Sequence, residues 1–341
     1  MDHLSESMPV RSEVVFLFSG QGSQFHHMGE ELMAESDVFR NTMRYLDRQA
    51  QRLIGSSVID YLYNQEVGRS QPFDRLLYSH PAVFMVQYAL VQTLIQAGLK
   101  PDAVCGYSLG ESVAAAVSEI ADPLDILTKM IHQAKLVEEM IPKGGMLAIL
   151  DDPVAYYRVP LLYTRSSLVS TKSKANLKQF VVAATSEAMA EIKQYLSAHN
   201  IVYHQLPVLY PYHSHHMDPL YDRYQSIINP MDYKKPAVTF VSAVYGQELK
   251  EINQQYWWDL LREPIHFQES IQYLEDLGAK TYIDISPSGE FTGYINLLKQ
   301  EGSASQAHAT LSPWRSCGMK NLKNIVSQAL YGRQMVQNYE L

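Results

Sequence analysis

The chain has 341 residues, which allows two or three structural units at roughly 150 residues each. Hydrophobic residues make up 46% and charged residues 19%, and this balance excludes a disordered, charge-swollen chain. The net charge of −8 argues against nucleic acid or an anionic membrane as the main partner. Two cysteines, Cys105 and Cys317, are too few for a disulfide framework and fit a reducing cytoplasm.

The sequence favours neither a signal peptide nor a membrane span. The N-terminal segment MDHLSESMPVRSE lacks the apolar core of a signal peptide. The charge-free apolar stretch 81–99 is long enough for a membrane span, but Gln87, Gln92, Thr93 and Gln96 interrupt it. We therefore predict a buried helix there and no membrane span.

Four short apolar runs are typical of buried strands. They are residues 13–18, 102–106, 237–244 and 281–285. Helical patterns lie between them, so the larger part of the chain is predicted to be α/β with a mostly parallel sheet.

Between residues 144 and 211 the pattern changes to shorter strands. Runs 146–150, 180–184 and 201–208 are predicted strands, and Ser186 is predicted to cap a helix. That helix would carry Met189, Ile192 and Leu196 on one face. We predict a small βαββαβ unit here, inserted into the larger domain.

The segment Gly106-Tyr107-Ser108-Leu109-Gly110 is the first candidate for chemistry. G-x-S-x-G between a strand and a helix is typical of a nucleophile elbow, where the helix dipole favours a developing negative charge near Ser108. The alternative is a strand-to-helix turn with a capping serine.

A histidine cluster could supply the base that a nucleophilic serine needs. His213, His215 and His216 all titrate in the right range, and spacing alone does not choose among them. A zinc site and plain surface histidines are the alternatives. No second cluster has zinc-ligand spacing, so we expect no metal.

A glycine loop, Ser19-Gly20-Gln21-Gly22-Ser23-Gln24, follows the first predicted strand. Such a loop can expose backbone N–H groups to a phosphate or an oxyanion. It lacks the lysine of a phosphate-binding loop, and it could be a plain turn.

Together these three segments, in this order, resemble the acyltransferase family of fatty-acid and polyketide synthases, the malonyl-CoA:acyl-carrier-protein transacylase type. The resemblance covers about residues 13–330 and includes four further segments, which are 81–84, 256–257, 262–265 and 286–289. It implies an α/β-hydrolase-like large domain, 11–143 and 212–332, with a ferredoxin-like small domain at 144–211.

The resemblance also implies roles by position. Ser108 would be the nucleophile and His213 the general base. The backbone N–H groups of Leu109 and Gln21 would form the oxyanion hole, and a main-chain carbonyl near Leu260 would orient the histidine.

One departure from the family pattern bears on the substrate. Malonyl-specific members carry an arginine in the helix after the elbow, where this chain has Gln133. A malonyl carboxylate would be desolvated there without a counter-ion, at a cost of roughly 3–5 kcal/mol. Lys135 lies two positions on and is expected to point to a different face. The acyl group is therefore predicted to be uncharged.

Three softer departures also concern acyl selectivity. Tyr107 replaces the usual histidine before the nucleophile, and His80 replaces a common glutamine. The segment from Tyr210 to His213 matches neither the H-A-F-H pattern of malonyl enzymes nor the Y-A-S-H pattern of methylmalonyl enzymes. Acyl size is left open.

A chain with glutamine at this position resembles the editing acyl hydrolases of trans-acyltransferase polyketide synthases, which serve antibiotic biosynthesis. The resemblance implies a cytoplasmic serine hydrolase that removes acyl groups from acyl carrier proteins. Its partners would be those carriers and small acyl thioesters, with no cofactor beyond the phosphopantetheine of the carrier. The alternative is an acyltransferase acting between CoA and a carrier protein, and a catalytically silent docking protein is a third possibility.

Overall fold

The computed structural model describes residues 13–174, 177–228, 231–299, 302–315 and 317–338. A six-stranded sheet forms the centre of the larger domain, in the order β10-β9-β1-β2-β7-β8. Its first five strands pair in parallel, and β8 pairs with β7 antiparallel. The strands are β1 (Glu13–Phe18), β2 (Ala103–Gly106), β7 (Thr239–Ser242), β8 (Gln247–Glu248), β9 (Ala279–Asp284) and β10 (Gln306–Ala309).

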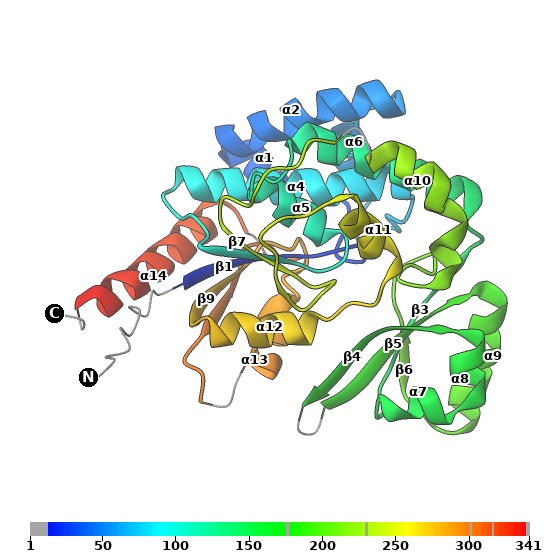
Figure 1. The fold of residues 1–341 in the computed structure, drawn as a ribbon. Helices are drawn as coiled ribbons and strands as arrows, with labels where there is room; N and C mark the ends of the chain where they lie inside the picture. Colours follow the sequence, from blue (N-terminus) through cyan, green and yellow to red (C-terminus); the bar gives the residue numbers. More distant parts are fainter. Residues whose placement is uncertain (1–12, 175–176, 229–230, 300–301, 316, 339–341) are drawn as a thin grey trace.

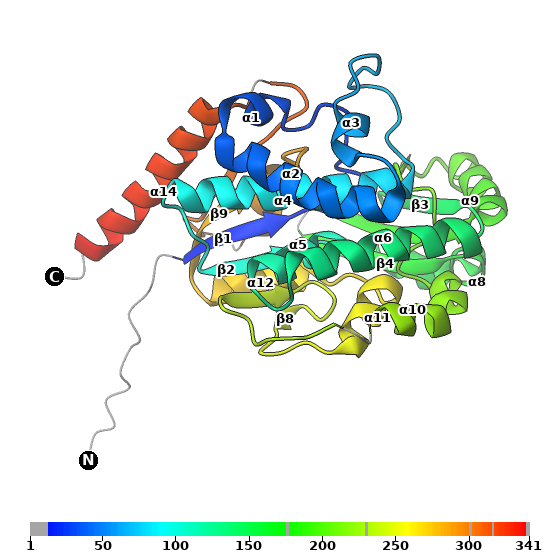
Figure 2. The same ribbon diagram turned by 90° about the horizontal axis from the view of Figure 1, so that it is seen from above.

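Helices cover both faces of this sheet (Figure 1). On one face lie α2 (Asp37–Ile54), α4 (Leu76–Gln96) and α6 (Pro123–Met140), and on the other lie α12 (Phe267–Asp276) and α13 (Phe291–Leu298). In the view from above, α2, α4 and α6 lie in front of the sheet (Figure 2). The remaining helices of this domain are α1 (Glu30–Glu35), α3 (Val58–Leu62), α5 (Gly110–Val117), the 3-10 helix His215–Leu220, α10 (Tyr221–Ile228), α11 (Gln254–Arg262) and α14 (Met319–Asn338).

Two of these helices show how the sequence determines the layers. Helix α2 begins where the Ser36 side chain accepts a hydrogen bond from the Phe39 N–H, and it ends at Gly55 with a φ of 88°. Helix α4 is apolar on nearly all sides and is buried between neighbouring elements, which confirms the predicted buried helix. Of the helices described, none combines the length and apolarity needed to cross a membrane.

The smaller domain has a four-stranded antiparallel sheet in the order β4-β5-β3-β6. Its elements follow the predicted βαββαβ sequence, with two short helices in the first crossover. They are β3 (Gly144–Ile149), α7 (Val154–Arg158), α8 (Pro160–Arg165), β4 (Ser167–Lys174), β5 (Leu177–Thr185), α9 (Ser186–Ala198) and β6 (Tyr203–Gln205). In Figures 1 and 2 this domain lies at the opposite end of the molecule from α14.

The cap of helix α9 differs from the prediction by one residue. The Thr185 side chain accepts the hydrogen bond from the Ala188 N–H, and Ser186 is the first helical residue. The Ser186 hydroxyl instead donates to the Lys143 carbonyl. Ser and Thr are both good caps, so composition alone does not choose between adjacent ones. The predicted apolar face of Met189, Ile192 and Leu196 is buried.

Candidate active site

Ser108 stands on a sharp turn between β2 and α5. Its φ of 54° lies in the left-handed region, which a nucleophile elbow imposes on its serine. The flanking glycines are required by close contacts, because a Cβ on Gly106 would collide with the Glu111 backbone and one on Gly110 with the Phe18 carbonyl. The turn therefore presents the hydroxyl at the start of α5.

The structure brings His213 to this serine. The Ser108 hydroxyl lies 2.8 Å from His213 Nε2, although the residues are 105 positions apart. His213 Nδ1 donates to the Glu263 carbonyl at 3.0 Å, so Nε2 is left to accept the serine proton. Burial lowers the pKa of His213 to about 4, so the imidazole is neutral at physiological pH and its Nε2 can accept a proton.

The carbonyl that orients His213 is not the one expected from sequence. The expectation of Leu260 was wrong, since the acceptor is the Glu263 carbonyl, beyond the end of α11. The Leu261 carbonyl accepts the backbone N–H of His213 at 3.1 Å. Any residue type can supply a main-chain carbonyl, so the sequence predicts only the approximate position of this acceptor.

The other two histidines of the cluster lie elsewhere. His215 Nδ1 is 3.0 Å from the Ser167 hydroxyl, in a solvent-exposed contact with the small domain. Neither His215 nor His216 lines the cavity in front of Ser108.

Glu111, in the first turn of α5, fixes the elbow to the rest of the domain. Its buried carboxylate accepts hydrogen bonds from the Ser242 hydroxyl, the Val244 N–H and the Tyr256 hydroxyl. Burial raises the pKa of Glu111 to about 7. This residue had no role in the sequence prediction. Its link to Tyr256 connects two of the segments on which the resemblance was based.

A small cavity of about 30 Å³ opens in front of the Ser108 hydroxyl. Its walls come from the glycine loop, from α4, α5, α6 and α11, and from the segment before the 3-10 helix. The lining residues are Gln21, His80, Ser108, Leu109, Ser112, Met130, Gln133, Tyr212, His213, Leu260 and Leu261. Gln21, Leu109, His80 and Gln133, which were predicted to lie at the active site, therefore all line this cavity. The oxyanion-hole role of the first two stays a prediction.

Gln133 faces the cavity with its amide already oriented. The Tyr224 hydroxyl donates to Gln133 Oε1 at 3.0 Å, so the amide nitrogen is left as the donor. Among the residues that the structure describes, no arginine or lysine lines this cavity. Lys135 points away, as expected, and donates to the Leu53 carbonyl at 2.6 Å.

A cation does lie behind the cavity wall, and the sequence reasoning missed it. Lys129 is 2% exposed, and its Nζ donates to the hydroxyl of the lining residue Ser112 at 3.2 Å. The same Nζ lies 3.8 Å from the centre of the Trp257 ring. Burial lowers the pKa of Lys129 to about 7. The sequence feature that could have revealed Lys129 is its position four residues before Gln133, which places both residues on the same face of α6.

Two proposed selectivity residues lie outside this cavity. Tyr210 packs edge-on against Tyr212, with ring centres 6.5 Å apart. Tyr107 lines a neighbouring cavity of about 190 Å³, which also borders Gln21 and contains Val181 and Leu206 of the small domain. That second space lies between the two domains and adjoins the serine site through Gln21.

Comparison with known proteins supports one family. The family described as "Acyl transferase domain" matches residues 15–331, nearly the whole chain. This chain belongs to the acyl transferase domain family. The fold and the Ser108–His213 pair are what an enzyme acting on acyl thioesters through a serine needs.

Individual relatives agree with this assignment. The chain is 36% identical over 312 residues to the polyketide biosynthesis acyltransferase homolog PksD of Bacillus subtilis, covering 92% of this chain and 95% of PksD. It is 38% identical over 301 residues to the homolog BaeD of Bacillus velezensis, covering 88% and 92%. The solved acyl transferase domain of SpnD superimposes with a TM-score of 0.83 at 22% identity, covering 96% of this chain and 78% of that one. The last comparison supports the fold alone.

Proposed function

We propose that this acyl transferase domain is an editing acyl hydrolase, which releases uncharged acyl groups from acyl carrier proteins. The Ser108 hydroxyl attacks the thioester carbonyl while His213 Nε2 takes its proton, and the Leu109 and Gln21 N–H groups stabilise the oxyanion. The proton passes to the leaving phosphopantetheine thiol. His213 then takes a proton from water, which attacks the Ser108 ester and releases the free acid.

The proposal of an uncharged acyl group rests on Gln133. Its amide, held by Tyr224, stands where malonyl-specific relatives are expected to have arginine, and it supplies no charge. Lys129 does not replace that charge directly, because Ser112 lies between its Nζ and the cavity. A malonyl carboxylate would be buried against neutral groups, and the cost falls on binding and loading alike.

The relatives support a carrier protein in polyketide biosynthesis as the source of the acyl group. PksD and BaeD are both described as polyketide biosynthesis acyltransferase homologs and match over most of their length. We propose that this chain, like a trans-acting enzyme, meets its carriers as separate proteins.

The test combines acyl-carrier proteins with purified enzyme and follows both products. Malonyl, acetyl and butyryl carriers are offered with and without a second acceptor thiol, and free acid and acyl-enzyme are measured by mass spectrometry. We expect acetyl and butyryl acids to be released in both conditions and malonyl to be loaded at least about tenfold less. Malonyl loading as fast as acetyl loading would contradict the charge argument.

The same experiment separates hydrolysis from transfer. Both reactions share Ser108, His213 and the oxyanion hole, so no residue discussed so far distinguishes them. If the acyl group moves to the added thiol and free acid is formed only in its absence, the protein is a transferase for neutral acyl groups.

A further inference from the structure

Three residues that line the active-site cavity each carry a buried polar atom with no hydrogen-bond partner in the described part of the chain. The atoms are Gln21 Nε2, His80 Nδ1 and the Tyr212 hydroxyl. All three residues line the cavity that contains Ser108, and His80 and Tyr212 are 3% and 7% exposed. Leaving buried polar atoms unpaired is costly, so a group of them around one small cavity indicates a polar ligand.

The three residues are neighbours, and their unpaired atoms are complementary in type. His80 Nε2 lies 3.4 Å from Gln21 Oε1, and the His80 and Tyr212 ring centres are 6.1 Å apart. Burial, with a smaller effect of the nearby Lys129 charge, lowers the pKa of His80 to about 3 and keeps its ring neutral. With Nε2–H donating to Gln21, Nδ1 is an acceptor, whereas the Gln21 amide and the Tyr212 hydroxyl are donors.

One acceptor and two donors match the hydrogen-bonding pattern of a single water molecule. A buried water typically makes about three hydrogen bonds. The cavity of about 30 Å³ has room for a water molecule. An alkyl chain would cover the three atoms without pairing them.

We infer that Gln21, His80 and Tyr212 hold the water that hydrolyses the Ser108 ester. The inference rests on the proposed hydrolase function and explains why water, rather than a thiol, reaches the ester first. Two of the three residues adjoin the chemistry: Tyr212 precedes the base His213, and Gln21 carries the N–H expected in the oxyanion hole.

The step balances as an ester hydrolysis. The water oxygen forms a bond to the acyl carbon as its proton passes to His213 Nε2. The bond between the acyl carbon and Ser108 Oγ then breaks, and Oγ takes the proton from His213. In this scheme Gln21, His80 and Tyr212 are positioning residues that act through the water.

The experiment loads Ser108 with acetyl from acetyl-carrier protein and measures two rates separately. Acylation is followed as the mass increase of the intact protein, and deacylation as its decay after the carrier is removed. We expect Tyr212→Phe and His80→Leu to slow deacylation roughly tenfold while acylation stays within about twofold. An added thiol should then capture a larger share of the acetyl group. His80→Gln restores an acceptor and should recover part of the water rate.

Matched controls separate this role from packing. Tyr88→Phe removes a hydroxyl from α4, and His27→Gln removes a buried imidazole elsewhere; neither residue lines the active-site cavity, and both variants should deacylate like the wild type. Because the Tyr212 hydroxyl has no partner within the described part of the protein, the melting temperature of Tyr212→Phe should stay close to that of the wild type.

Three outcomes are decisive. Unchanged deacylation in both Tyr212→Phe and His80→Leu would overturn the water site and leave the hydrolase function standing. Equal slowing of acylation and deacylation would also overturn it, since that is the effect of disturbed packing. A wild-type acetyl-enzyme that is stable in water and yields only to thiols would refute the proposed function itself, and the water site with it.

Discussion

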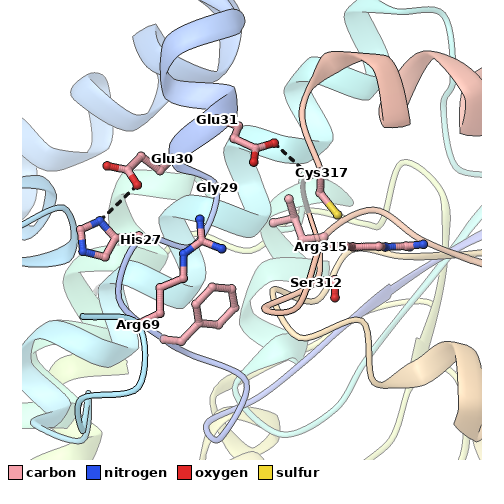
Figure 3. Close-up of a pocket in the computed structure, with 10 residues that line it drawn as sticks. His27, Gly29, Glu30, Glu31, Arg69, Ser312, Arg315 and Cys317 are labelled. Atoms are coloured by element: carbon pink, nitrogen blue, oxygen red, sulfur yellow. Dashed lines mark hydrogen bonds and ion pairs between the residues drawn. The ribbon is translucent and has the colours of Figure 1, made fainter. Parts of the chain in front are cut away.

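Two buried histidines, in two different cavities, differ in what faces their second ring nitrogen. His27 lines a cavity between the start of α1 and the segment before α14 (Figure 3). Its ring nitrogens face the Val67 carbonyl at 2.7 Å and Glu30 Oε2 at 3.2 Å. Nearby, Glu31 accepts the Cys317 N–H at 2.9 Å. His80, in the active-site cavity, has a long contact to Gln21 and an unpaired Nδ1.

The difference shows how to read polar cavities in this fold. In the cavity of Figure 3, His27 is held by the Val67 carbonyl and its Nδ1, which makes no hydrogen bond, lies within ion-pair distance of the Glu30 carboxylate. Glu31 holds the Cys317 N–H, so these polar residues act as structural ties. In the active-site cavity the fold leaves donors and an acceptor unpaired beside a nucleophile and its base. Unpaired groups are expensive, and a site that keeps them is organised for a ligand or a water molecule.

The strongest way to break this contrast is to remove the nucleophile. Ser108→Ala should abolish acyl-enzyme formation and lower acid release by at least about a thousandfold, because His213 has no ester to act on. Intact-protein mass spectrometry and product analysis measure both. The variant should keep its melting temperature within a few degrees, and a variant that still becomes acylated would place the nucleophile elsewhere.

Changing the charge in the cavity should have the next largest effect. Gln133→Arg should raise malonyl loading about tenfold, because the guanidinium can pair with the malonyl carboxylate. The gain is limited because the Tyr224 hydroxyl loses its acceptor.

Lys129 supplies the control for that experiment. Adding Lys129→Met to Gln133→Arg should reduce the malonyl gain, since it removes a second nearby positive charge that attracts the bound carboxylate. The ratio of malonyl to acetyl loading is the readout, because it cancels losses of folded protein. A ratio that does not move in either variant would mean that the carboxyl group is bound elsewhere.

Much of this site could be predicted because its chemistry is local in sequence. The strand-turn-helix around Ser108 and the glycine loop around Gln21 follow short rules of backbone conformation, and the structure has both. The strands predicted at 13–18, 102–106, 237–244 and 281–285 are β1, β2, β7 and β9. Continuous apolar runs identify central strands, whereas the edge strands β8 and β10 are too short and polar to be recognised.

The parts that could not be predicted depend on contacts between distant segments. The Glu263 carbonyl that orients His213 is a main-chain group, and any residue type could supply it. Lys129 reads as a surface lysine until the packing of α6 against Ser112 and Trp257 is known. The unpaired atoms of Gln21, His80 and Tyr212 are visible only once three separate segments share one cavity.

The pH dependence offers a smaller effect with a definite sign. The neutral form of His213 is the base, and burial lowers its pKa to about 4, below the usual 6.5. Acylation should therefore keep most of its rate down to about pH 5, where an unperturbed histidine would have lost more than nine-tenths of its neutral form. Single-turnover acylation between pH 4 and 8 tests this. An acid limb centred near 6.5 would show that His213 is more accessible to solvent than its burial indicates.

The smallest expected effect on activity comes from changing His27, in the cavity of Figure 3. His27→Gln removes the ring that joins Val67 and Glu30, so the free energy of unfolding should fall by about 1–2 kcal/mol. Acylation and deacylation should stay within about twofold of the wild type, because the cavity of Figure 3 shares no lining residue with that of Ser108. Urea unfolding and single-turnover kinetics on one preparation measure both. A loss of deacylation with stability intact would mean that the two cavities are coupled and that His27 is more than a structural tie.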